Sequence, residues 1–178
     1  MIGSIRSGLL GFLVSFFGFT VPVYSDVVYR LGSGDKLKVT VFEEIDLSGS
    51  FEVAGDGVVS LPLIGPVNAQ GLSIRDLEDR IKVRLLDGYL RNPRVSIEVL
   101  NYRPFYILGE VKEPGSYPYV NGMSVLNAVA LGGGYTYRAN KKKITLLREG
   151  SSEEGKQIVT QETKVLPGDV IRVEERFF

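Results

Sequence analysis

Two aromatic rings and a group of cations stand close together between residues 135 and 143 of this chain. The candidate contact residues are Tyr135, Tyr137, Arg138 and Lys141, with Lys142 and Lys143 directly after them. Aromatic faces combined with cations suit sugar rings and acidic groups such as uronate or phosphate. The alternative is a strand edge whose lysines prevent aggregation and whose rings face the core. The sequence leaves both interpretations open.

Adjacent acids are the other residues with chemical potential, at Glu43–Glu44, Glu153–Glu154 and Glu174–Glu175. Two carboxylates about 5 to 9 Å apart can hydrolyse a glycosidic bond. Neighbouring acids in polar segments point in different directions, however, and no pattern marks a cleft around these pairs. The sequence therefore favours solvated surface acids, and we assign no catalytic residue.

The composition narrows the possible chemistry further. The 178 residues include no His and no Cys, which excludes Cys/His zinc sites, thiol nucleophiles and a Ser-His-Asp triad. Lys and Arg number 21, as do Asp and Glu. A general nucleic-acid binder would carry a clear basic excess, so we expect no nucleic-acid partner.

The triple glycine at 132–134 could be taken for a phosphate-binding loop. It follows a predicted helix instead of opening one, and it lacks the G-K-[ST] ending of such loops. We interpret it as a helix stop. The sequence therefore predicts neither a cofactor nor a metal site.

The elements that must position the aromatic and basic residues follow from the stretch 105–138. An apolar strand is predicted over 105–111, and Pro114 with Gly115 predicts a type II turn in which Gly115 takes a positive φ. Tyr117, Tyr119 and Val120 would form the returning strand. Ser124 then caps a short helix, which Gly132 and Gly133 end.

Alternating apolar residues predict further strands before and after that unit. A helix is predicted to begin after Ser73 and to end at Gly88, with Ile74, Leu77, Ile81 and Leu85 on its apolar face. The polar run 149–156 is predicted to be a loop. The predicted strands are 36–42, 58–61, 94–100, 144–148, 157–163 and 170–174.

Two short segments, far apart in the chain, have similar sequences. Residues 34–39, GDKLKV, parallel residues 168–173, GDVIRV, and both precede or form predicted strands. The starts of the two predicted helices, at Ser73 and Ser124, also match. Gly-Asp before a strand is a common turn solution, so the similarity could reflect a duplicated unit or a coincidence.

The N-terminal segment has the pattern of a cleavable signal peptide. Arg6 supplies a positive charge, residues 9–21 form an apolar run, and Ser25 follows as a small residue at the predicted cleavage site. The apolar run is short for a membrane span, which needs about 20 residues. We therefore expect export with cleavage near Ser25, with an uncleaved anchor as the alternative.

Two regions resemble signatures of bacterial capsular and exopolysaccharide export proteins. One is the unit described above, where that family has a strand, a G-x-V-x-x-P-G turn, a helix ending in A-x-x-x-G-G and a strand with R-A. The other lies upstream, where residues 29–35 and 57–65 resemble the export domain that precedes this unit. The matching residues of the first region are Gly109, Val111, Pro114, Gly115, Ala128, Gly132, Gly133, Arg138 and Ala139.

The resemblance implies an α+β fold. It comprises an N-terminal polysaccharide-export domain of mixed strands with one helix, followed by a β-grasp (SLBB) domain. We expect a signal peptide at 1–25, the export domain at 26–101 and the SLBB domain at 102–178. Gly109, Pro114, Gly115, Gly132 and Gly133 would be structural residues of the second domain.

The resemblance also implies a non-enzymatic role in exporting a polysaccharide, in the periplasm and in association with the outer membrane. Family members form rings through which the polymer leaves, so we expect a homo-oligomer with an inner-membrane polysaccharide co-polymerase and an outer-membrane partner. Many members continue past the last strand of the SLBB domain into an amphipathic membrane-spanning helix; since this sequence stops at Phe178, we expect the protein to rely on another one for the membrane crossing. Two alternatives are a soluble glycan-binding or regulatory β-grasp receptor and, more weakly supported, a polysaccharide-processing enzyme.

Overall fold

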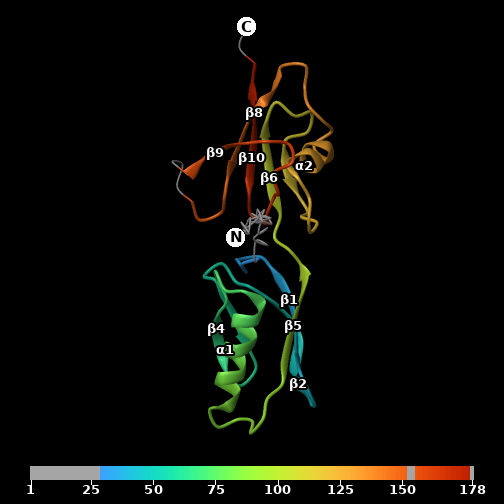
Figure 1. Cartoon of the computed structure of the whole chain (residues 1–178). Helices are drawn as coiled ribbons and strands as arrows, with labels where there is room; N and C mark the ends of the chain where they lie inside the picture. Colours follow the sequence, from blue (N-terminus) through green and yellow to red (C-terminus); the bar gives the residue numbers. More distant parts are fainter. Residues whose placement is uncertain (1–28, 152–154, 177–178) are drawn as a thin grey trace, which may run out of the picture.

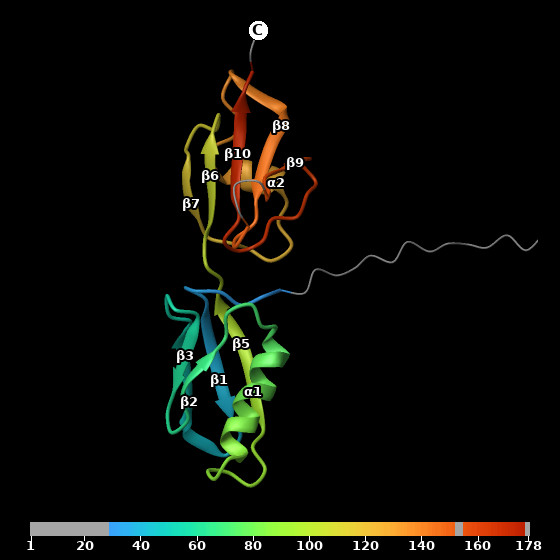
Figure 2. The ribbon, with the colours of Figure 1, turned by 90° about the vertical axis from the view of Figure 1, so that its left-hand side faces the viewer.

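The protein is built from two lobes stacked end to end, as Figures 1 and 2 show. The computed structural model describes residues 29–151 and 155–176. The first lobe contains β1 (Lys36–Val41), β2 (Glu44–Glu52), β3 (Val58–Leu61), β4 (Gly65–Asn68), α1 (Ile74–Leu86) and β5 (Val95–Asn101). The second contains β6 (Phe105–Gly109), β7 (Gly115–Tyr117), α2 (Val125–Leu131), β8 (Ala139–Leu147), β9 (Gln157–Val159) and β10 (Val170–Glu175). This composition confirms the predicted α+β class.

The first lobe pairs a three-stranded antiparallel sheet, in the order β2-β1-β5, with the separate hairpin β3-β4. The predicted alternation of β1 is confirmed, because Leu37, Val39 and Val41 are buried while the residues between them are exposed. Helix α1 packs beside β5 and contributes Leu77 and Ile81 to the core of this lobe. The hydrophobic effect of this shared core holds the sheet, hairpin and helix together.

Helix α1 begins and ends where the sequence predicts. Ser73 is the N-cap, and its side chain accepts a hydrogen bond from the backbone N–H of Asp76, while the Asp76 carboxylate accepts one from the Ser73 backbone. Such reciprocal bonds satisfy two N–H groups that have no partner within the helix. After the helix, Gly88 has a φ of 88°, a left-handed conformation that glycine adopts without a steric penalty.

The second lobe has a five-stranded mixed sheet in the order β7-β6-β10-β8-β9. Its central pair, β6 and β10, is parallel, and the other neighbours are antiparallel. Helix α2 packs Val125, Ala128 and Val129 into a second core, separate from the first. The largest buried side chain of that core is Phe105. A mixed sheet with one helix against it is the arrangement that the β-grasp interpretation predicts.

Helix α2 confirms the interpretation of Ser124 and of the triple glycine. Ser124 is the N-cap and forms a capping box with Asn127. Gly132 is the C-cap, and both Gly133 and Gly134 have positive φ values, 72° and 87°. The glycines therefore end a helix, and they open no helix that could bind a phosphate.

The predicted turn at Pro114 and Gly115 is wrong in its geometry. Gly115 is the first residue of β7 and does not have a positive φ. The residue that takes a left-handed conformation is Gly109, with a φ of 84°, at the end of β6. The returning strand is also shorter than predicted, because β7 ends at Tyr117.

Several strand boundaries differ from the prediction. Strands β2 and β4 were not predicted, β8 begins five residues earlier than the predicted strand at 144, and β9 ends at Val159 instead of 163. The predicted signal peptide, and residues 152–154 of the predicted loop, lie outside the described residues. Among the residues that the structure describes, no helix has the length and apolar content to span a membrane.

Candidate functional site

The residues predicted to contact a ligand lie around a bulge at the start of β8. Val173 of β10 pairs with Ile144, whereas Glu175 pairs with Ala139. Four residues of β8, from Asn140 to Lys143, therefore stand opposite the single residue Glu174. A bulge of this kind bends the strand and projects its extra residues away from the sheet.

The bulge is stabilised locally by its first residue. The Asn140 side-chain oxygen accepts a hydrogen bond from the backbone N–H of Lys142, with a donor–acceptor distance of 3.1 Å. This Asx-type bond replaces a ladder bond that the strand loses at the bulge. Lys141, Lys142 and Lys143 are all exposed, so the strand presents three successive cations to solvent.

A pocket of about 540 Å³ opens beside this bulge. Tyr137, Lys141, Lys142 and Arg176 contribute its aromatic and charged side chains. Arg176 also donates a hydrogen bond to the backbone oxygen of Tyr137, at 3.1 Å. Thr136, Ala139 and Asn140 complete the lining. Of the described residues that line the pocket, three are cations, one is aromatic and none is an acid.

The four predicted contact residues have different surroundings. The Lys141 ammonium lies 5.4 Å from the centre of the Tyr135 ring, within the range of a cation–π interaction, and Tyr135 packs partly against the core. Arg138 forms an ion pair with Glu175. Tyr137 is 86% exposed as a residue and contributes to the pocket. Tyr137 and Lys141 are thus available to a ligand, whereas Arg138 is already paired.

Arg176 was missed as a candidate because it comes from the other end of the domain sequence. It lies beside Tyr137 only because β10 pairs with β8 in this register. A hydrophobic pattern predicts that a strand exists, but not which strand it pairs with. No signal in the sequence singles out this arginine.

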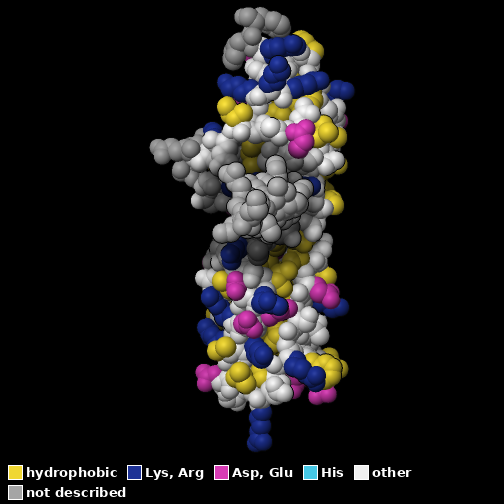
Figure 3. Space-filling view, viewed as in Figure 1, with side chains coloured by type: hydrophobic (Ala, Val, Ile, Leu, Met, Phe, Trp, Pro, Cys, Tyr) yellow, Lys and Arg dark blue, Asp and Glu magenta, His cyan; other side chains and the backbone are white. Residues whose placement is uncertain are grey.

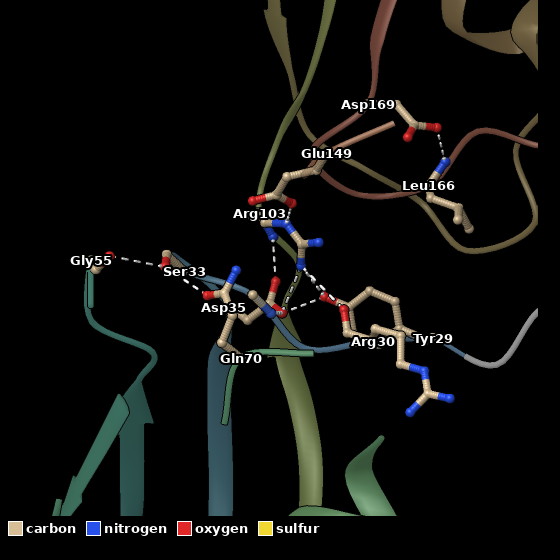
Figure 4. Close-up of polar contacts among 11 residues, drawn as sticks. Tyr29, Arg30, Ser33, Asp35, Gly55, Gln70, Arg103, Glu149, Leu166 and Asp169 are labelled. Atoms are coloured by element: carbon tan, nitrogen blue, oxygen red, sulfur yellow. Dashed lines mark hydrogen bonds and ion pairs between the residues drawn. The ribbon is translucent and has the colours of Figure 1, made fainter. Parts of the chain in front are cut away.

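The second polar centre of the molecule lies at the junction between the lobes (Figure 4). Asp35 is fully buried and accepts hydrogen bonds from the backbone N–H groups of Gly32 and Arg103, both at 2.9 Å. The Arg103 guanidinium donates to the same carboxylate at 3.0 Å, and the Tyr29 hydroxyl also donates to it. Four donors therefore compensate this buried charge.

Arg103 also connects the two lobes. Its guanidinium pairs with Asp35 of the first lobe and with Glu149 of the second. Burial alone would lower the pKa of Arg103, but Tyr29, Asp35 and Glu149 together raise it. The guanidinium therefore stays charged. Since its side chain is only 12% exposed, we interpret this residue as a structural link.

The turn around Asp35 has a counterpart around Asp169 in the second lobe. Each aspartate is buried, accepts a hydrogen bond from the backbone N–H three residues earlier and follows a glycine of positive φ. Arg148 pairs with Asp169 as Arg103 pairs with Asp35. The similar segments 34–39 and 168–173 thus form the same local structure, and duplication and coincidence both stay open as explanations.

Rings also line the junction. Tyr29 and Tyr102 meet edge to face with centroids 4.9 Å apart, and Tyr102 meets Tyr119 in the same way at 5.2 Å. Edge-to-face pairs at these distances are favourable beyond the area that they bury. Tyr29 belongs to the first lobe and Tyr119 to the second, so these contacts support the same junction as Arg103.

The acidic residues that the structure describes are dispersed. No group of three or more Asp and Glu side chains within them could hold a metal ion. Glu175 is engaged by Arg138, Glu43 is exposed on a turn with a φ of 66°, and Glu153 and Glu154 lie outside the described residues. Neither described acid pair, 43–44 or 174–175, lines the pocket beside β8.

The buried Asp169 makes a testable contribution to pH dependence. Burial raises the pKa of Asp169 to about 6 from its ordinary value of 3.8, against the lowering effect of the Leu166 N–H and Arg148. Between pH 4 and pH 6 the folded protein then holds more of this proton than the unfolded chain. The contribution of this group to the free energy of unfolding therefore falls as pH rises through that window.

We expect Asp169→Asn to remove this pH-dependent contribution to the free energy of unfolding. Across the whole window the contribution amounts to at most about 3 kcal/mol. The measurement is urea unfolding at pH 4 and pH 7, followed by circular dichroism. The exposed Asp46, changed to Asn, is the matched control and should leave the slope in place. Parallel pH profiles of wild type and Asp169→Asn would contradict the assignment.

Comparison with known proteins connects this structure to a family. Residues 23–100 match the family model described as polysaccharide biosynthesis/export protein, and residues 104–161 match the SLBB domain model. The chain belongs to the polysaccharide export protein family. The two domains follow in the order that the sequence resemblance predicts, so that resemblance is confirmed.

Individual members of the polysaccharide export family are also similar to this chain. The exopolysaccharide production protein ExoF of Rhizobium meliloti is 35% identical over 150 residues, which cover 78% of this chain and 36% of ExoF. The polysialic acid transport protein KpsD of Escherichia coli is 31% identical over 119 residues, which cover 66% of this chain and 21% of KpsD. This chain therefore corresponds to only part of each relative.

Proposed function

We propose that this protein is a non-enzymatic component of an exopolysaccharide or capsular polysaccharide export system. The observation that carries the proposal is the succession of an export domain and an SLBB domain on one chain. The names of two relatives, which refer to exopolysaccharide production and polysialic acid transport, support the same role. The absence of His and Cys from the sequence also favours a passive role, because it removes the commonest catalytic base and the thiol nucleophile.

We further propose that the protein acts in the periplasm, in association with the outer membrane, and that several copies assemble into a ring around the polymer. A polymer can move through such a conduit only if each contact is weak enough to release it. The open pocket beside β8, with cations and one exposed ring, suits weak and repeated contacts. An inner-membrane polysaccharide co-polymerase and an outer-membrane partner would complete the route.

Deletion of the gene tests the export role. We expect polymer to accumulate inside the cell envelope while its synthesis continues, and the wild-type gene on a plasmid to restore secretion. The measurement is the amount of polymer in the medium and in the periplasmic and cytoplasmic fractions. Normal secretion by the deletion strain, with no change in any fraction, would reject the proposal.

Native mass measurement of the mature protein, with and without detergent, tests the ring. A defined multiple of the protomer mass is the expected result. A protein that stays monomeric at high concentration and with its envelope partners present would instead favour a soluble glycan-binding receptor.

A further inference from the structure

We propose that the pocket beside β8 is an anion-binding subsite that recognises acidic groups on a sugar polymer, so that the exported polysaccharide carries carboxylate or similar charges. The inference rests on the proposed export role and adds the chemical class of the polymer.

The charge of the pocket contrasts with that of the whole protein. The chain has equal numbers of basic and acidic residues, yet the charged residues lining this pocket are Lys141, Lys142 and Arg176. Figure 3 shows Lys and Arg side chains gathered at the end of the second lobe that lies farthest from the first. Cations concentrated around a concave surface attract anions and raise their local concentration.

Two acids near the pocket, Glu175 and Glu110, each have a hydrogen-bond partner of their own. Glu175 is held by the ion pair with Arg138, and Glu110 accepts a hydrogen bond from the Thr136 hydroxyl at 2.5 Å. Neither glutamate lines the pocket. Among the described residues, Lys141 and Lys142 therefore face a pocket that no acid lines.

The bulge is the feature that places the lysines there. In a regular strand, Lys141 and Lys142 would point to opposite faces of the sheet. The irregular register between Ala139 and Ile144, with the Asn140 bond to the Lys142 backbone, brings both side chains to one pocket. Such a geometry costs ladder hydrogen bonds, so a binding role gives a physical reason for it.

The exposed Tyr137 ring favours a sugar over a simple inorganic anion. An aromatic face can stack on the apolar face of a pyranose ring, while the neighbouring cations pair with its acidic substituent. A pocket of about 540 Å³ also exceeds the volume that one small anion needs. The combination fits a charged sugar unit within a longer chain.

The test uses the purified mature protein and two probes of matched length. One probe is oligogalacturonate, which has a carboxylate on every sugar, and the other is the same oligomer with its carboxyl groups reduced to alcohols. Calorimetric titration at low and high salt gives the affinity for each. We expect oligogalacturonate to bind roughly tenfold more tightly, with a preference that weakens as salt screens the charges.

Two variants separate charge from stacking. The double variant Lys141→Gln/Lys142→Gln should bind oligogalacturonate roughly fivefold to tenfold more weakly and leave the neutral probe unchanged. Tyr137→Ala should weaken both probes. The matched control, Lys38→Gln/Lys82→Gln, removes two exposed lysines of the first lobe and should bind both probes as the wild type does.

Equal affinity for the two probes, or unchanged binding by the Lys141→Gln/Lys142→Gln variant, would overturn the inference. Binding to phosphatidylglycerol vesicles without binding to oligogalacturonate would also overturn it and would assign the pocket to a membrane surface. Each of these results would leave the export role intact if the deletion strain still retains its polymer. Normal secretion by that strain would instead reject the export role itself.

Discussion

Replacing Gly109 with Ala is expected to destabilise the second lobe by more than about 3 kcal/mol. Gly109 ends β6 with a φ of 84°, where any other residue is strained. A Cβ atom at this position would also overlap the carbonyl oxygen of Val173 and lie 3.1 Å from its carbonyl carbon. Val173 belongs to β10, which pairs with β6 at the centre of the sheet, so neither backbone can move without breaking that pairing.

Gly122→Ala is the control that separates conformational strain from the clash. Gly122 has a similar φ of 83°, but a Cβ atom there would meet nothing within 4 Å. We expect Gly122→Ala to lower the free energy of unfolding by only about 1–2 kcal/mol. Urea unfolding of both variants, followed by far-ultraviolet circular dichroism because the chain has no Trp, gives the comparison. Equal losses of stability in the two variants would show that the close approach of β10 to Gly109 does not contribute to the effect of Gly109→Ala.

The second large effect is expected at the junction between the lobes. There, Arg103→Met should lower the free energy of unfolding by about 3–5 kcal/mol. Methionine keeps most of the aliphatic stem but removes the guanidinium that pairs with the fully buried Asp35. A buried carboxylate without its cation is strongly unfavourable. The same change removes the pair with Glu149, so we also expect the two lobes to move more freely relative to each other.

Arg30→Met is the matched control for the junction. Arg30 and Asp76 form an ion pair whose side chains are 60% and 54% exposed, and exposed pairs of this kind contribute about 1 kcal/mol or less. The double variant Asp35→Asn/Arg103→Met should recover part of the lost stability, because no buried carboxylate remains at position 35. Calorimetric unfolding measures the stabilities, and small-angle scattering measures the lobe arrangement. An Arg103→Met protein as stable as Arg30→Met would contradict the role assigned to Arg103.

Local patterns explain which elements the sequence predicted. Ser73 and Ser124 cap their helices as expected because a capping box involves only residues three apart. The alternation of β1 identified a strand with one buried face. Strand β2 was not predicted because its sequence lacks the usual strand signals. Leu47 is its only buried residue, so the strand shows no alternation, and Gly49 lowers its strand propensity.

The candidate site and the junction depend on contacts that no local pattern encodes. Arg103 is 68 residues from Asp35 and 46 from Glu149, and their meeting depends on how the lobes stack. Arg176 lies beside Tyr137 because of the register between β8 and β10. The sequence predicted Tyr137 and Lys141 as a cluster of suitable chemistry, but not the bulge that places Lys142 beside them. Features that depend on which strands pair, and in which register, could not be predicted from local sequence patterns.

We propose that this protein contacts the polysaccharide during export through the surface beside β8. The decisive experiment places a photo-crosslinking amino acid at position 137 in cells that make the polymer. We expect carbohydrate-containing adducts from position 137, and far fewer from position 83, where Val83 is 66% exposed on α1. An absence of carbohydrate from the position-137 adducts, in cells that are secreting polymer, would contradict it.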